Sequence, residues 1–214
     1  MNYTKLLREY CKKNNGAIFD VSKLKDTEFS EVPYKTLLKI LNRLEEEGLL
    51  KPVSKGVYFI GEKPVDEELI FDEYVDNGKG MFVGYQLFND VGISDYFDCK
   101  IEIYTNNIKS KQKSVGQYFL KKVDLEFDDD TVDLVALLDI IDTGYSMKGC
   151  DFMAYKKTVD MLLKSYSDSS FEKIIKAIRY KYSTIKQLSE LLEANSIDNN
   201  CIDTFENTYK NSIR

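Results

Sequence analysis

Residues 31–60 constrain the fold of this chain most strongly, because they place an amphipathic helix directly before a short basic hairpin. Apolar residues recur in this helix at spacings of three and four, which puts them on one side. Pro33 suits the first turn, where a missing N–H costs nothing, and Gly48 suits the left-handed residue that follows a helix. The pattern predicts a helix with marked boundaries at both ends. Its apolar stripe is Leu37, Ile40, Leu41 and Leu44.

Two short strands are expected after this helix, over residues 50–53 and 56–60, joined by a turn at residues 54–56. Upstream, residues 3–14 are expected to form a first helix, followed by a short extended segment and a second helix near residues 21–24. That order, with a hairpin directly behind the last helix, is typical of a winged helix-turn-helix. We therefore predict a winged helix-turn-helix DNA-binding domain over residues 1–61, while noting that such folds also serve as protein–protein modules.

The functional hypothesis for this domain is that double-stranded DNA lies against the polar face of the helix. Lysine and arginine side chains would neutralise phosphates there, and polar side chains would reach base edges in the major groove. The alternative is an ordinary surface helix whose polar side is only solvated. The predicted DNA-binding residues are Lys35, Thr36, Lys39, Asn42 and Arg43 on the helix, and Lys51, Ser54 and Lys55 on the wing.

The net charge of −6 hides an uneven distribution along the chain. Residues 1–61 carry 11 Lys and Arg against 8 Asp and Glu, whereas residues 62–155 carry 9 against 20. Residues 156–186 are basic again, with 8 against 3. A local positive face matters more for DNA binding than the total charge does, and an acidic body would repel DNA that approached in the wrong orientation.

The chain contains no histidine, which excludes Ser-His-Asp and Cys-His nucleophile systems and histidine general bases. No glycine-rich nucleotide-binding signature is present either, so we expect neither an enzyme nor a cofactor. The cysteines lie far apart in sequence, which suits reduced structural thiols better than a zinc site or disulfides. A divalent-metal site at the aspartates between residues 128 and 142 is an alternative, with metal-dependent catalysis as a third functional class, but a solvated turn and a helix N-terminus explain these aspartates more simply.

A second domain is expected over residues 66–214, after a linker at residues 62–68 that contains Pro64. It should be a mixed α+β domain that ends in helices, so that the whole chain belongs to the α+β class. One of those helices is expected to run over residues 169–183, with Ser169 or Ser170 as its cap. Its basic surface is a possible second DNA contact, and the alternative is a solvated face. That surface consists of Lys173, Lys176, Arg179 and Lys181.

The order of these parts resembles a known family. The winged helix of residues 32–60 is followed by GMFVGYQLFNDVGIS, KIEIYTN and a helix of the type TVDLVALLDII. In this combination residues 1 to about 145 look like the AbiEi-type antitoxin regulators of bacterial type IV toxin-antitoxin systems. The resemblance implies a repressor that binds repeats at the promoter of its own operon. It also implies a neighbouring nucleotidyltransferase-like toxin, whose action the repressor counters without necessarily touching it. The wing departs from the family, because it has only Lys51 and Lys55 where relatives are often richer in arginine.

We therefore expect a DNA-binding transcriptional regulator, an autorepressing antitoxin. The alternative is a protein-interaction module whose acidic C-terminal domain binds a basic toxin or another partner. No apolar run is long enough to span a bilayer, and the first residues lack the apolar centre of a signal peptide. The expected location is the cytoplasm, with no membrane partner.

Overall fold

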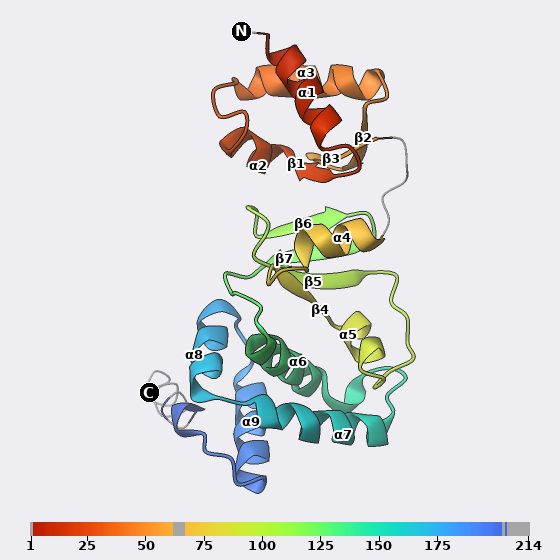
Figure 1. The fold of residues 1–214 in the computed structure, drawn as a ribbon. Coiled ribbons are helices and arrows are strands. Elements are labelled where there is room, and N and C mark those ends of the chain that lie inside the picture. Colours follow the sequence, from red (N-terminus) through yellow and green to blue (C-terminus); the bar gives the residue numbers. More distant parts are fainter. Residues whose placement is uncertain (1, 62–66, 203, 205–214) are drawn as a thin grey trace.

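The protein has a mixed α+β fold in which strands and helices alternate along the first two thirds of the chain and helices follow. The structure is a computed structural model that describes residues 2–61, 67–202 and 204. Figure 1 shows three layers along one long axis: an N-terminal unit, a central sheet and a helical end. Within the described residues, none of the helices combines the length and the apolar character needed to cross a membrane.

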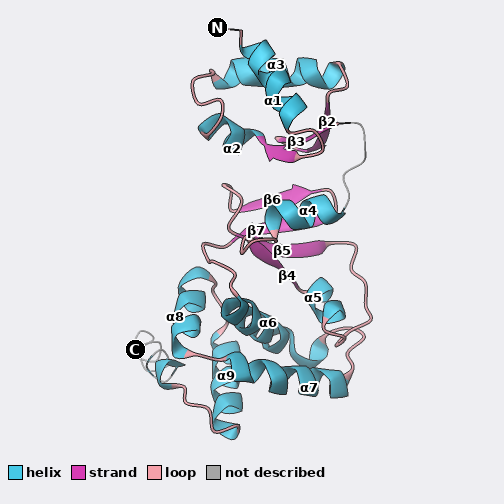
Figure 2. Cartoon of the chain, in the orientation of Figure 1, coloured by secondary structure: helices cyan, strands magenta, loops and turns pink. Residues whose placement is uncertain are grey.

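The N-terminal unit, residues 2–61, places two helices and a short third helix over a small antiparallel sheet (Figure 2). The strands pair in the order β1-β3-β2, and the register opposes Phe19 to Tyr58 and Leu50 to Ile60. The β2–β3 hairpin shifts register between Pro52 and Ser54. The elements are α1 (Tyr3–Lys13), β1 (Ile18–Asp20), α2 (Val21–Asp26), α3 (Tyr34–Glu46), β2 (Leu50–Ser54) and β3 (Val57–Ile60).

The apolar stripe predicted on α3 is confirmed, because all four of its side chains are buried. They pack with Leu7 and Cys11 of α1 and with Leu24 of α2 in one hydrophobic cluster. Complete burial of a leucine side chain contributes about 1.5–3 kcal/mol. The stripe therefore fixes which face of α3 points inward and which face remains outside.

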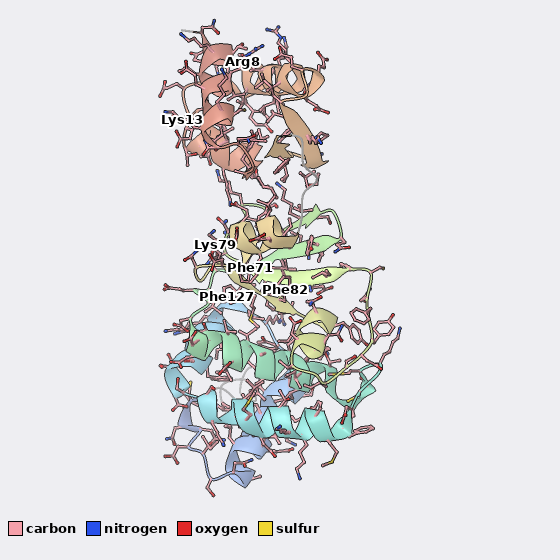
Figure 3. All side chains as sticks on the ribbon, turned by 45° about the vertical axis from the view of Figure 1, so that its right-hand side comes forward. Arg8, Lys13, Phe71, Lys79, Phe82 and Phe127 are labelled. Atoms are coloured by element: carbon pink, nitrogen blue, oxygen red, sulfur yellow. The ribbon has the colours of Figure 1, made fainter. Side chains whose placement is uncertain are left out.

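The central sheet pairs its strands in the order β4-β5-β7-β6, with β5 and β7 parallel and the other pairs antiparallel. In the sequence, α4 precedes this sheet and α5 connects β4 to β5 (Figure 1). Phe71 of α4 stacks on Phe82 of β4, with ring centroids 6.5 Å apart (Figure 3). The elements are α4 (Glu67–Tyr74), β4 (Gly80–Val83), α5 (Tyr85–Asp90), β5 (Ile101–Thr105), β6 (Gln112–Val115) and β7 (Tyr118–Lys122).

The helical end packs against the other face of the central sheet around α6, whose side chains are buried along most of its length. The N-cap of α6 is Asp128. One sequence prediction was wrong here, because the N-cap of α8 is Ser167 rather than Ser169 or Ser170. The elements are α6 (Asp129–Thr143), η1 (Gly144–Ser146), α7 (Phe152–Leu162), η2 (Leu163–Ser165), α8 (Asp168–Ala177) and α9 (Tyr182–Ala194).

The N-terminal unit and the central sheet share an apolar contact. Val57 and Phe59 of β3 belong to the same buried cluster as Ile103 of β5 and Leu120 of β7. The division into domains at residues 61 and 66 stays a prediction. Most of the predicted linker, including Pro64, lies outside the described residues, but its last two residues are not linker because α4 begins at Glu67.

Candidate nucleic-acid interface

The helix α3 is held in place by its ends as well as by its apolar stripe. Pro33 lies at the N-cap, one position earlier than predicted, and its carbonyl accepts the N–H groups of Thr36 at 2.8 Å and Leu37 at 3.0 Å. At the other end, the Leu49 N–H donates to the Leu44 carbonyl at 2.9 Å across Gly48, whose φ is +77°. This is a Schellman motif, which a glycine allows without strain. The helix therefore begins and ends where its sequence requires.

The outward face of α3 is cationic and uncovered. Lys35, Lys39 and Arg43 are exposed, and in residues 2–61, 67–202 and 204 no ion pair neutralises any of them. Asn42 is exposed beside them, and Thr36 is half-buried. Figure 1 shows α3 on the side of the N-terminal unit that faces away from the central sheet. Of the five side chains predicted on α3 to bind DNA, four are therefore exposed to solvent and the fifth, that of Thr36, is partly exposed.

Lys35 and Lys39 place positive charge in the first turns of α3, whereas Arg43 lies in the last turn, beside the acidic residues Glu45, Glu46 and Glu47. The helix dipole adds positive potential at the same N-terminal end. One of the acids is compensated, since the Arg8 guanidinium of α1 lies 2.6 Å from the Glu47 carboxylate. An anionic partner would therefore be favoured at the N-terminal half of α3.

The helix α1 adds basic side chains that the sequence analysis did not single out. Lys5, Lys12 and Lys13 are exposed on it. Figure 3 shows Lys13 and Arg8 on the outside of the N-terminal unit. The lysine and arginine content of residues 3–13 was the available signal, but only the structure shows that α1 packs beside α3.

The β2–β3 hairpin, which the sequence predicts to be a wing, differs from the prediction in one respect. Lys51 and Lys55 are exposed as expected, but the hydroxyl oxygen of Ser54 is buried and has no hydrogen-bond partner in the structure. Gly56 forms the turn with a φ of +73°. Ser54 and Lys55 line a cleft that faces the central sheet, so the wing turn points partly toward the rest of the molecule.

The predicted second basic surface is not a single helix face. Lys173 and Lys176 lie on α8, but the helix ends at Ala177 and Ile178 is extended, so Arg179 and Lys181 belong to the connection to α9. Tyr180, in the same connection, has a buried hydroxyl group. Lys173, Lys176 and Lys181 pair with Asp128, Glu172 and Asp142 at 3.9, 3.3 and 2.9 Å, whereas no ion pair of Arg179 exists within the described residues. Figure 1 shows α8 at the end of the molecule opposite α3.

The aspartates between residues 128 and 142 serve separate roles. Asp128 accepts the Thr131 N–H at 2.9 Å, and the hydrogen bonds from Thr131 hold the pKa of its carboxyl below the usual value. Asp133 accepts from the Ser165 hydroxyl at 2.7 Å, and Asp142 pairs with Lys181. Within the part of the chain that the structure describes, no three Cys, Asp or Glu side chains are grouped to hold a metal ion.

Among these aspartates, Asp139 has the carboxyl whose pKa departs most from its ordinary value. Its carboxylate accepts the N–H of Gly84, at the turn between β4 and α5, at 2.7 Å. Burial raises the pKa of its carboxyl to about 6, against the lowering effects of that hydrogen bond and of Lys121. A carboxyl that titrates near neutral pH can exchange protons, but here it also joins α6 to the central sheet. Asp139 therefore has a structural role, because its carboxylate connects α6 to the turn after β4.

With this geometry established, the comparison with known proteins adds no family. No protein-family model matches the chain, and no curated protein has a significantly similar sequence.

Proposed function

We propose that this protein is a DNA-binding transcriptional regulator that docks its N-terminal unit on double-stranded DNA as a winged helix-turn-helix. The element order α1, β1, α2, α3, β2, β3 and the antiparallel pairing β1-β3-β2 support that fold assignment. In such a domain α3 is the recognition helix and the β2–β3 hairpin is the wing.

The observation that carries the proposal is the open cationic face of α3. Lys35 and Lys39 are suited to phosphate oxygens, while Asn42 and Arg43 have the donor patterns that read adenine and guanine edges. On the wing, Lys51 and Lys55 are the phosphate contacts. The hydroxyl group of Ser54 is buried, so it would have to become accessible before it could contact a phosphate.

A charge-reversed variant of α3 tests the proposal. Lys39→Glu combined with Arg43→Glu should keep the fold, since both side chains are exposed, and should abolish binding to the DNA upstream of its own gene. The matched control is Lys156→Glu with Lys157→Glu, two exposed lysines on α7 at the other end of the molecule. A mobility shift that is lost in the first variant and kept in the second supports the proposal. An unchanged shift in the α3 variant refutes it.

The finer proposal is that this regulator is the autorepressing antitoxin of an AbiEi-like type IV toxin-antitoxin system, acting in the cytoplasm. In support, the segment that resembles this family forms β4, a turn at Gly84, the helix α5 and a left-handed turn at Gly92, followed by β5 and α6. Its gene should lie beside one for a nucleotidyltransferase-like toxin, and co-expression should relieve the growth arrest that this toxin causes. Toxicity that persists despite co-expression would reject the antitoxin role while leaving DNA binding intact.

An interaction module is the second candidate function, and exposed apolar side chains at the helical end favour it. Phe152 and Met153 of α7 are 62% and 78% exposed, and Tyr145 places its ring centroid 5.4 Å from that of Phe152. Exposed apolar patches commonly mark protein contacts. Purification from cells that carry the native operon separates the two candidates, because an interaction module should retain a stoichiometric protein partner, whereas a pure regulator should be recovered alone.

A further inference from the structure

A cleft of about 680 Å³ separates the wing turn from the edge strand β6 of the central sheet. The N-terminal unit contributes Ser22, Ser54 and Lys55 to its lining, and the segment leading into and along β6 contributes Lys109, Ser110 and Lys113. Residues about 90 positions apart in sequence, such as Asp20 and Lys113, meet here. Neither half of the chain forms this lining alone.

The lining is rich in cationic and hydroxyl donors. Lys55, Lys109 and Lys113 oppose one carboxylate, that of Asp20. Asp20 is already occupied, because Lys113 pairs with it and the Ser22 N–H and hydroxyl donate to it at 2.7 and 2.6 Å. Burial raises the pKa of the Asp20 carboxyl, but the hydrogen bonds from Lys113 and Ser22 outweigh it and hold the pKa below the usual value. Because Lys113 pairs with Asp20 and Lys109 pairs with Asp26, the positive charge left in the cleft is that of Lys55.

Two of its lysines have unused donor capacity. Within the described residues, Lys55 makes no ion pair and no hydrogen bond through its side chain. The Lys109 ammonium contacts Asp26 and donates to the Ser22 carbonyl at 2.8 Å, which leaves one of its three N–H groups available. An anion in the cleft could therefore accept hydrogen bonds from both walls at once.

The hydroxyl group of Ser54 is the independent sign of a ligand. Ser54 lines this cleft, but its hydroxyl oxygen is buried and has no hydrogen-bond partner within the described residues, so the hydroxyl group must rotate toward the cleft to meet a ligand. A buried hydroxyl without a hydrogen bond is costly, and natural structures rarely keep one without a reason. An oxygen acceptor seated in the cleft would satisfy it.

We propose that this cleft binds a phosphate group, held by Lys55 and Ser54 from the wing and by Lys109 and Ser110 from the central sheet. Phosphate fits this donor set because its several acceptor oxygens can engage ammonium and hydroxyl groups together. Its source is either a DNA backbone passing beside the wing or a free phosphate compound. The site rests in part on the proposed function, in which Lys55 already contacts DNA phosphate, and deepens it by adding Lys109 and Ser110, but it does not require α3 to contact DNA.

Titration of the full-length protein with inorganic phosphate tests the site, with backbone amide resonances as the readout and chloride at equal ionic strength as the salt control. Saturable shifts are expected on both walls, at Ser22, Gly56 and Ser110. Lys55→Gln and Lys109→Gln should each weaken phosphate binding about tenfold, the loss expected for one charge-assisted hydrogen bond. Lys111→Gln, an exposed lysine in the same loop that does not line the cleft, should change it less than twofold.

The variant Ser54→Ala distinguishes two explanations of the unpaired hydroxyl group: that it contacts a ligand, or that it is merely unsatisfied. The substitution should lower phosphate affinity several-fold if the hydroxyl donates to the anion. Unchanged phosphate affinity in a more stable protein would instead mean that the hydroxyl is merely unsatisfied, and would overturn its assignment to the site. Absence of saturable shifts at the cleft amides would overturn the whole proposal, even if a duplex still bound through α3.

A DNA duplex distinguishes the two sources of phosphate. If the backbone is the source, a duplex from upstream of the gene should displace inorganic phosphate, and Lys109→Gln should weaken duplex binding as well. If a free compound is the source, phosphate should still bind while duplex affinity is unaffected by Lys109→Gln. A protein that binds phosphate in the cleft but no duplex would leave this site standing and refute only the proposed function.

Discussion

The ammonium group of Lys113 on β6 contacts the carboxylate of Asp20 at the end of β1. Both side chains are largely buried, with exposed fractions of 13% and 7%. Lys109–Asp26 and Lys23–Glu73 are further ion pairs between the N-terminal unit and the residues after it, but they are more exposed. Among these three pairs, the Asp20–Lys113 pair is the most buried.

Replacing Lys113 by methionine should lower the free energy of unfolding by about 3 kcal/mol, because it leaves the buried Asp20 carboxylate without its partner. The double variant Asp20→Asn with Lys113→Met should recover part of this loss. Urea denaturation at pH 7 measures both. Equal stability of the single variant and the wild type would show that the pair contributes nothing.

The same pair predicts an acid dependence. The pKa of Asp20 is below its usual value in the folded protein, so its stabilisation is present above the unfolded-state pKa and is lost as pH falls through the folded-state pKa. Lys113→Met should remove that loss, and its stability should change less than that of the wild type between pH 5 and pH 2. Parallel pH profiles for the two proteins would contradict this interpretation.

Asp139 predicts the opposite dependence. Its folded-state pKa, about 6, lies above the ordinary value of 3.8, so its contribution to stability is fully present below pH 4 and is lost as pH rises through 6. Asp139→Asn can still accept the Gly84 N–H and should stabilise the protein by about 1–2 kcal/mol at pH 8, with little effect at pH 4. Urea denaturation at both pH values, with the exposed Asp130→Asn as control, measures the difference. A variant less stable than the wild type at pH 8 would mean that the carboxylate form is required.

Gly48→Ala tests the end of α3. Gly48 has a φ of +77° and no atom near the position of a Cβ, so the substitution should cost about 1 kcal/mol through backbone strain alone. Gly48→Asn should cost less, because asparagine tolerates this conformation better. Thermal unfolding of the two variants gives the comparison, and identical melting temperatures for Gly48→Ala and the wild type would show that the Schellman motif adds no stability.

The sequence predicted local features well where one residue type has one physical role. Pro33 and Gly48 marked α3 to within one residue, and the spacing of its leucines identified the buried face. It failed at α8, because Ile178 and Tyr180 continue the apolar spacing although the backbone becomes extended after Ala177. Periodicity cannot register a break that tertiary packing imposes.

Contacts between segments that are distant in sequence could not be predicted either. Nothing in the local sequence pairs Asp20 with Lys113, or directs the Asp139 carboxylate to the Gly84 N–H. The alternating lysines at residues 109, 111 and 113 stand out in an acidic stretch and were the available signal for the cleft. Their meaning depends on the wing turn, which only the fold brings beside them.

The salt dependence of binding to the DNA upstream of its own gene tests the central claim most directly. If α3 and the wing engage about six phosphates, the logarithm of the association constant should fall with the logarithm of salt concentration at a slope near −5. The variant Lys39→Glu with Arg43→Glu should show no specific binding to this DNA at any salt concentration in the series. A flat salt response, or equal affinity of this variant and the wild type, would contradict the account.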